Sequence, residues 1–184
     1  DHCEVPAGCG GFVLRWRNPS QGLPLTFWVY AAGSFQFFVD GKLLSSSRPI
    51  VSFGDHVVSL VIRGCDPSQV VLLCAATLED KTDGTGYDER SAARVVHFLS
   101  MPDGSWKYAC AEPADPAWQC VGYDDSRWLA MEKREWPQDA EKTSGVPNAY
   151  HAEQLLGMGA QGLGIGERAS TIWIRRRFII RADA

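Results

Sequence analysis

The sequence SFQFFVDGK, at residues 34–42, contains the strongest short signal for a β-hairpin in this chain. Ser34 to Val39 is rich in aromatic and β-branched residues, which favour strands. Asp40-Gly41 is a pair preferred by two-residue type I′ turns, because both central positions of that turn need a positive φ. We therefore predict that Lys42 to Ser45 returns antiparallel to the first strand.

Further segments on both sides of this hairpin have the composition of strands. They are Gly11 to Arg17, Leu25 to Ala32, His56 to Arg63, Val70 to Leu78, Arg94 to Leu99, Trp106 to Cys110 and Thr171 to Ile180. Asp66 to Gln69 has the composition of a tight turn, which predicts that the strands on either side of it pair as a hairpin. Helical periodicity is limited to a short turn near Ala149 to Leu156.

These segments predict an all-β fold of two packed antiparallel sheets, with long irregular loops and at most one short helix. A chain of 184 residues with 45% hydrophobic residues can bury one core, so we expect a single β-sandwich domain over residues 1–184. Within it, residues 137–169 are predicted to be a Gly-rich irregular insertion.

Charge and hydropathy exclude two classes of partner. The net charge is −4 and both signs are spread along the chain, whereas a nucleic-acid surface needs a basic stripe. No apolar run approaches the ~20 residues that span a bilayer, so no membrane span is expected.

Cysteine usage and the start at Asp1 predict an exported, extracellular protein. Six cysteines are scattered singly, without the close pairing of zinc sites. We expect a disulfide between Cys110 and Cys120, which flank a Pro-containing loop, and another between Cys3 and Cys9. Two outcomes stay open for the remaining pair: Cys65 bonds to the N-terminal cysteines, or Cys74 is a buried free thiol.

The last strand carries a charge on its core face. Alternation places Arg176 on the same side as Ile174 and Phe178, and a buried Arg needs a carboxylate because an unpaired buried charge is very costly. We expect Arg176, or its neighbour Arg175, to pair with Asp124 or Asp125. All of these acidic and basic groups are then scaffold.

Four stretches resemble, in order, the landmarks of galactose-binding-like jelly-roll domains, the β-sandwiches attached to α-rhamnosidases, β-galactosidases and other glycoside hydrolases. They are residues 27–42, 103–107, 123–128 and 172–178. The resemblance covers most of the chain except residues 137–169. It implies a jelly-roll fold and a module that accompanies catalysis without performing it.

The search for chemistry supports the same view. The chain has no Gly-x-Ser-x-Gly elbow, Walker loop or His-Glu-x-x-His helix, so we predict no catalytic residues and no cofactor. Gly157-x-Gly159-x-x-Gly162 matches a dinucleotide fingerprint in spacing only, and a close-packed loop is the expected explanation. A structural calcium site and a solvated loop both fit the acids Glu79, Asp80, Asp83 and Asp88.

Aromatic residues are the best candidates for a binding site, because flat rings stack on the apolar face of a sugar. We expect Trp16, Trp136 and the pair Tyr150-His151 to bind a glycan or cell-surface polysaccharide, and we expect Trp28, Trp106, Trp128 and Trp173 to pack inside. The predicted function is a secreted, non-catalytic carbohydrate-binding module. The alternative is a structural subunit that self-associates into an extracellular coat, fibre or appendage.

Overall fold

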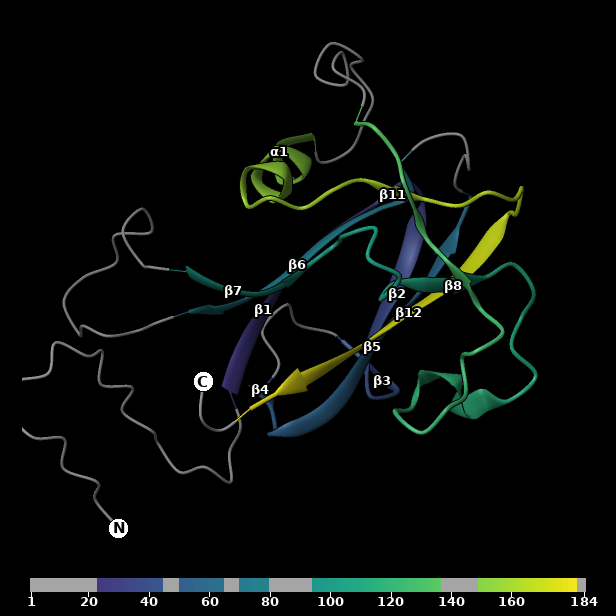
Figure 1. Cartoon of the computed structure of the whole chain (residues 1–184), viewed down its shortest axis with the longest axis horizontal. Helices are drawn as coiled ribbons and strands as arrows, with labels where there is room; N and C mark the ends of the chain where they lie inside the picture. The colour runs from purple at the N-terminus through teal and green to yellow at the C-terminus, as the bar shows by residue number, and fades with distance from the viewer. Residues whose placement is uncertain (1–22, 45–49, 65–69, 80–93, 137–148, 182–184) are drawn as a thin grey trace, which may run out of the picture.

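A computed structural model describes residues 23–44, 50–64, 70–79, 94–136 and 149–181 of the chain. Two six-stranded antiparallel sheets pack face to face in this part of the molecule (Figure 1). The prediction of an all-β sandwich is confirmed. The single α-helix of the described residues is short.

Sheet one has the strand order β10-β11-β6-β1-β4, and β7 pairs with β6 beside β11. The bounds are β1 Leu23–Ala31, β4 Ile50–Val51, β6 Leu72–Glu79, β7 Arg94–Leu99, β10 Glu132–Lys133 and β11 Leu163–Gly164. Sheet two has the order β3-β2-β5-β12-β8-β9. Its bounds are β2 Ser34–Val39, β3 Lys42–Leu43, β5 Gly54–Arg63, β8 Lys107–Ala109, β9 Leu129–Ala130 and β12 Thr171–Ile180.

The predicted hairpin forms between β2 and β3. Asp40 has φ 49° and Gly41 has φ 76°, as a type I′ turn requires. The Asp40 carboxylate also holds the start of β5, because its Oδ1 accepts a 2.9 Å hydrogen bond from the backbone N–H of Val57. Its Oδ2 lies 2.7 Å from Nδ1 of His56, so the turn is tied to the neighbouring strand by two contacts.

The second predicted hairpin is wrong. β5 lies in sheet two between β2 and β12, whereas β6 lies in sheet one and pairs with β1, so that Cys74 is opposite Val29 of β1. Both strands are buried over most of their length, because each is central in its own sheet. A turn-like sequence marks a change of direction, and it does not distinguish a hairpin from a crossing between sheets.

The core lies between the two inner faces. Strand alternation sends one side of each central strand into it. The completely buried aliphatic side chains of this core are Leu25, Val58, Leu60, Ile62, Val71, Leu72, Ala76, Leu163, Ile172 and Ile174. Phe27 packs against Phe37, Phe98 and Phe178 with ring centroids 5.1–6.5 Å apart, which joins the sheets through aromatic contacts.

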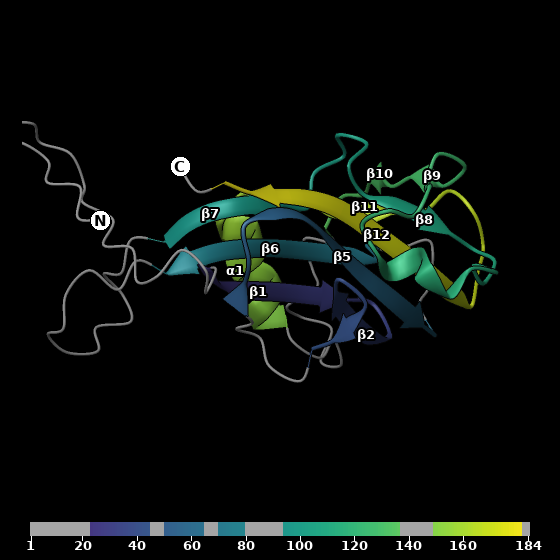
Figure 2. The same cartoon turned by 90° about the horizontal axis from the view of Figure 1, so that it is seen from below.

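Each sheet also has a covered outer face. Helix α1 (Ala149–Gly157) packs on the outside of sheet one, where Ala152 and Leu155 meet Leu73 and Ala75 in a second apolar cluster. Residues 111–128, which we call the covering segment, lie on sheet two and contain the 3₁₀ helix η2 (Pro116–Gln119). Figures 1 and 2 show α1 against β6 and β1, and the covering segment beside β12 and β8, away from α1.

The segment 137–169 is more regular than expected in its described part. It contains α1, and β11 pairs with β6 and β10, so it completes one edge of sheet one. The predicted helical turn near residues 149–156 is confirmed as α1. The glycines of this region allow close packing. A Cβ at Gly162 would lie 2.5 Å from the carbonyl oxygen of Arg134.

The Cys110–Cys120 disulfide is not formed, and this prediction is wrong. Cys110 follows β8, whereas the covering segment carries Cys120 across sheet two until its Sγ is near Gly41 in the β2–β3 turn. Strands β12, β5 and β2 separate the two places, and adjacent strands are about 4.8 Å apart. Cys74 is buried and free. Cys3, Cys9 and Cys65 lie outside the described residues.

Arg176 occupies the inner face, as strand alternation predicted, without pairing to the 122–128 turn. Its guanidinium lies over the Phe98 ring at 4.6 Å and the Trp106 ring at 5.4 Å, and Nη1 donates a 2.6 Å hydrogen bond to the carbonyl of Leu99. Burial lowers the pKa of Arg176, and the negative charge of Asp103 opposes that shift. Aromatic faces and a carbonyl thus replace the expected carboxylate contact.

His97, near Arg176, gives the sandwich an acid-sensitive point. Burial lowers the pKa of His97 below its usual 6.5, and the charge of Arg176 lowers it further. The unfolded chain therefore binds a proton more readily than the folded one, so this contribution to stability is complete above about pH 6.5 and is lost as the pH falls through the lowered value.

We expect the free energy of unfolding to fall between pH 7.5 and pH 5, and the His97→Asn variant to show a shallower fall over that interval. Urea titrations at several pH values, with the wild-type chain as reference, measure both slopes. An unchanged slope in the variant contradicts the assignment to His97.

Candidate functional site

The turn Gly122–Trp128 holds the covering segment on sheet two through one buried ion pair. Arg175 is completely buried, and its Nη1 lies 2.9 Å from Oδ2 of Asp125. The two ends of the same guanidinium donate 3.0 Å hydrogen bonds to the carbonyls of Tyr123 and Cys120. The ion pair between the last strand and the turn therefore forms with Arg175 and not Arg176.

The rest of the turn supports the same structural role. Lys107 Nζ lies 2.9 Å from Oδ1 of Asp125 and Arg177 Nε lies 3.7 Å from its Oδ2, so three cations share this carboxylate. Asp124 is exposed and accepts a 3.0 Å hydrogen bond from the backbone N–H of Ser126, which is the main cause of its lowered pKa. Adjacent acids thus have different tasks: Asp125 joins the segment to β12 and β8, and Asp124 shapes the turn.

Aromatic side chains gather on the opposite side of the molecule. Alternation in β1 sends Leu25 and Phe27 into the core and turns Trp28 and Tyr30 outward, onto the side covered by α1. Trp136 joins them, and all three are half-buried. We call Trp28, Tyr30 and Trp136 the aromatic face.

Trp28 corrects a sequence prediction, because it was expected in the core. Its indole Nε1 donates a 3.2 Å hydrogen bond to Oγ1 of Thr77 on the neighbouring strand β6. Because Thr77 is itself buried, the indole is tied down across the sheet and not directed away from it. The alternation Leu25-Thr26-Phe27-Trp28 is the local signal, because it places Trp28 on the face of β1 opposite to Phe27.

Trp136 and Tyr30 form the other part of the aromatic face. Their ring centroids are 5.0 Å apart and the ring planes meet at 82°, an edge-to-face contact that makes a corner. Burial raises the pKa of Tyr30, so its hydroxyl keeps its proton and remains a hydrogen-bond donor. The chain just before Trp136 is fixed to sheet one. Two residues before Trp136, the N–H of Arg134 donates a 2.8 Å hydrogen bond to the carbonyl of Gly162.

Of the other predicted binding residues, the structure describes the backbone of Tyr150 and His151 only. Tyr150 and His151 lie in the first turn of α1, the helix that packs beside the aromatic face, and the placement of their side chains is not described. Trp16 lies outside the described residues. The structure thus brings Trp136 and the helix of the Tyr150-His151 pair to one side of sheet one, together with Trp28 and Tyr30.

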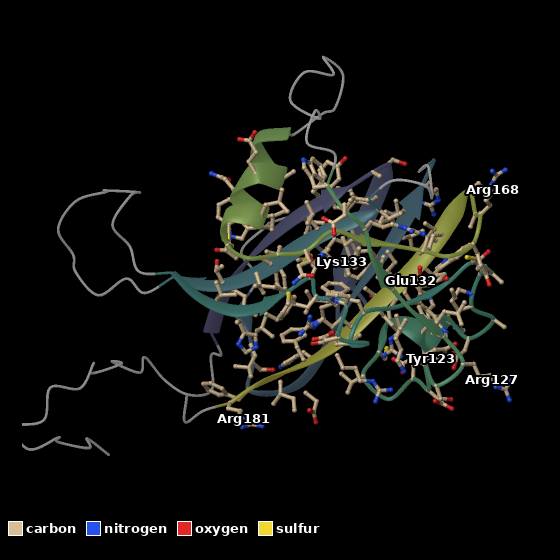
Figure 3. All side chains as sticks on the ribbon, turned by 45° about the horizontal axis from the view of Figure 1, so that its top comes forward. Tyr123, Arg127, Glu132, Lys133, Arg168 and Arg181 are labelled. Atoms are coloured by element: carbon tan, nitrogen blue, oxygen red, sulfur yellow. The ribbon has the colours of Figure 1, made fainter. Side chains whose placement is uncertain are left out.

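Figure 3 separates the two regions clearly. Tyr123 and Arg127 of the covering segment lie at one side of the view, and α1 lies at the other, with Glu132 and Lys133 of β10 between them. The covering segment is therefore remote from α1, with which the aromatic face packs. Substitutions in one region can be compared with substitutions in the other.

No three His, Cys, Asp or Glu side chains come together as a metal site within the described ranges. Of the calcium candidates, Asp80, Asp83 and Asp88 fall outside those ranges. In the dinucleotide-like Gly157-x-Gly159-x-x-Gly162, α1 precedes the glycines and β11 follows them, the reverse of the order that binds a pyrophosphate. The part of the chain that is described also contains no helix with the length and hydropathy to cross a membrane.

Comparison with known proteins identifies no relative. No family model, no curated protein and no solved structure matches the chain. The arguments about function therefore rest on the arrangement of this chain's own residues.

Proposed function

We propose that this protein is a secreted, non-catalytic carbohydrate-binding module of the galactose-binding-like jelly-roll type, and that it binds a glycan on the aromatic face. The observation that carries the proposal is Trp28. It is a half-buried indole on the outside of a sheet, and its only polar group is already bound to Thr77.

This geometry suits a sugar ring. With its N–H bound to the protein, Trp28 offers a ligand only the apolar surface of its rings, and the apolar face of a pyranose can stack on such a surface. The rings of Trp136 and Tyr30, which are nearly perpendicular to each other, belong to the same face. The protonated Tyr30 hydroxyl can donate to a sugar hydroxyl. The sandwich holds these rings rigidly, which limits the entropy lost on binding.

The test is a glycan array followed by calorimetry on the glycan that binds best. We expect Trp28→Ala and Trp136→Ala each to weaken binding by about tenfold or more, since the loss of one stacked ring removes on the order of 1.4 kcal/mol. Phe35→Ala is the matched control: Phe35 is an exposed aromatic on β2 of the other sheet, and its removal should not change affinity.

Thermal melts accompany each variant. Trp136→Ala is expected to lower the melting temperature only modestly, because the ring is half-exposed. A wild-type chain that binds no glycan on a broad array, or variants with unchanged affinity, would refute the proposal. Release of reducing sugar by the wild-type chain would contradict its non-catalytic part.

Self-association into an extracellular structure is the second candidate, and one observation favours it. At the edge of sheet two, the β2–β3 hairpin exposes two large apolar side chains, Phe35 at 44% and Leu43 at 57%. Edge strands with exposed apolar residues can pair with another copy. Light scattering after size exclusion would show polymers in this case, and Leu43→Lys would reduce them to monomers.

A further inference from the structure

The outer face of sheet two contains a polar position that strand composition does not explain. Ser59 is the one polar residue in the run Val57-Val58-Ser59-Leu60-Val61-Ile62 of β5. It is completely buried under the covering segment, and its Oγ has no hydrogen-bond partner among the described residues. A buried hydroxyl without a hydrogen-bond partner lowers the stability of the fold by about 1–3 kcal/mol, so we look for a bound molecule that supplies the missing hydrogen bond.

A second orphaned atom lies beside it. Arg175 is the direct partner of Ser59 in the antiparallel register of β5 and β12. Its Nη1 and Nη2 bind the covering segment, but its Nε is buried and has no hydrogen-bond partner within the described part of the chain. Directly opposed residues of two strands have Cβ atoms about 5 Å apart, so the two side chains are neighbours on the outer face of sheet two.

The chemistry of the two groups defines what fits between them. An Arg Nε–H can only donate, so the ligand must present a lone pair, while a Ser hydroxyl can donate or accept. The Asp125 carboxylate already lies 2.9 Å from the same guanidinium, and a second anion here would meet its negative charge. A small neutral hydrogen-bond acceptor satisfies both groups without this repulsion.

We propose that Ser59 and Arg175 form the binding site of one structural water molecule, which joins β5 and β12 to the underside of the covering segment. Buried waters typically make about three hydrogen bonds to polar groups that would otherwise be unsatisfied. Each of the three guanidinium nitrogens of Arg175 then has a partner: Nη1 and Nη2 hold the covering segment, and Nε holds the water. The Ser59 hydroxyl, polar in an otherwise apolar run of β5, supplies the second partner of this water.

The first test is a crystal structure of the full chain that resolves ordered solvent, grown in sodium bromide. The expected result is one water peak within about 3.2 Å of both Arg175 Nε and Ser59 Oγ, without an anomalous bromide signal. A bromide peak there, a direct Ser59–Arg175 hydrogen bond or empty density would overturn the proposal.

The second test uses the sign of a stability change. If a water bridges the groups, Ser59→Ala removes one of its partners, and the melting temperature falls by about 2–4 °C. If the Ser59 hydroxyl is a true orphan, Ser59→Ala removes an unsatisfied polar group and the melting temperature rises, which contradicts the proposal. Ser52→Ala is the control. Ser52 is exposed, and the substitution keeps its backbone carbonyl, which lies 2.8 Å from Nε2 of His56, so this variant should have the melting temperature of the wild-type chain.

Discussion

Asp125→Asn is expected to destabilise the protein by about 3 kcal/mol, because breaking a buried ion pair leaves an uncompensated charge. Arg175 is completely buried, and Asp125 is the carboxylate that balances it at 2.9 Å. The substitution conserves shape and removes the negative charge. The guanidinium would keep its two carbonyl partners, and Lys107 would face it without the shared acid.

The neighbouring residue provides the matched control. Asp124→Asn changes the same kind of side chain in the same turn, but Asp124 is exposed and contacts only the local backbone and Ser126 among its hydrogen-bond partners. Its unfolding midpoint should stay close to that of the wild-type chain. Urea unfolding followed by tryptophan fluorescence measures both variants, and equal losses at Asp124 and Asp125 would show that the ion pair is not what holds the turn.

A rescue separates charge from shape. In the double variant Arg175→Met with Asp125→Leu, both charges are absent and apolar side chains of similar volume replace them. Part of the stability lost in Asp125→Asn should return, because such replacements of buried pairs are often neutral or stabilising. Glycan binding should survive in every variant that stays folded, since the aromatic face lies on the other sheet.

Gly162→Ala is expected to cost about 2–3 kcal/mol, because overpacking against a rigid backbone forces a shift of the chain. The added Cβ would lie 2.5 Å from the carbonyl oxygen of Arg134 and 2.8 Å from Cγ2 of Val70. The backbone oxygen cannot rotate away as a flexible side chain could. The hydrogen bond from Arg134 N–H to the carbonyl of Gly162 would be strained or lost, and with it the approach of β10 to β11.

Gly157→Ala is the control for this prediction. Nothing lies within 4 Å of a Cβ at Gly157, and the residue ends α1, where Ala favours the helix. This variant should be as stable as the wild-type chain or slightly more stable. Because Trp136 follows Arg134 by two residues, Gly162→Ala should also weaken glycan binding, and Gly157→Ala should not. Equal stability of the two variants would contradict the prediction, because it would show that the backbone after α1 shifts at little cost.

Local signals of the sequence predicted much of the strand content. The Asp40-Gly41 turn, β2, β7 and β12 occur where composition placed them, because each depends on residues adjacent in the chain. The ion pair between β12 and the 122–128 turn was also expected in outline. The expectation named Arg176 or Arg175, because strand alternation alone does not show that the covering segment buries the outer face of β12; that burial makes Arg175 the residue that pairs with Asp125.

The exposure of the aromatic residues was predicted in part for the same reason. Trp136 was selected from its polar surroundings, which are visible in the chain, and it does lie half-exposed. Trp28 was missed because its exposure depends on the side of β1 that faces the second sheet, and on Thr77, which is 49 residues away. Alternation in residues 25–28 separates the two faces of β1, but no short window of residues shows which face is the core or supplies the contact with Thr77.

The sequence by itself therefore determined the class of fold, most of the strands and the hairpin at residues 34–43, because hydrophobic alternation and turn chemistry are local properties. Only the tertiary structure decided that β5 and β6 belong to different sheets, that Cys120 is carried away from Cys110, and that Arg175 meets Asp125. Those three outcomes depend on which face of each sheet is covered and by which distant segment. That choice is made by the packing of the whole chain.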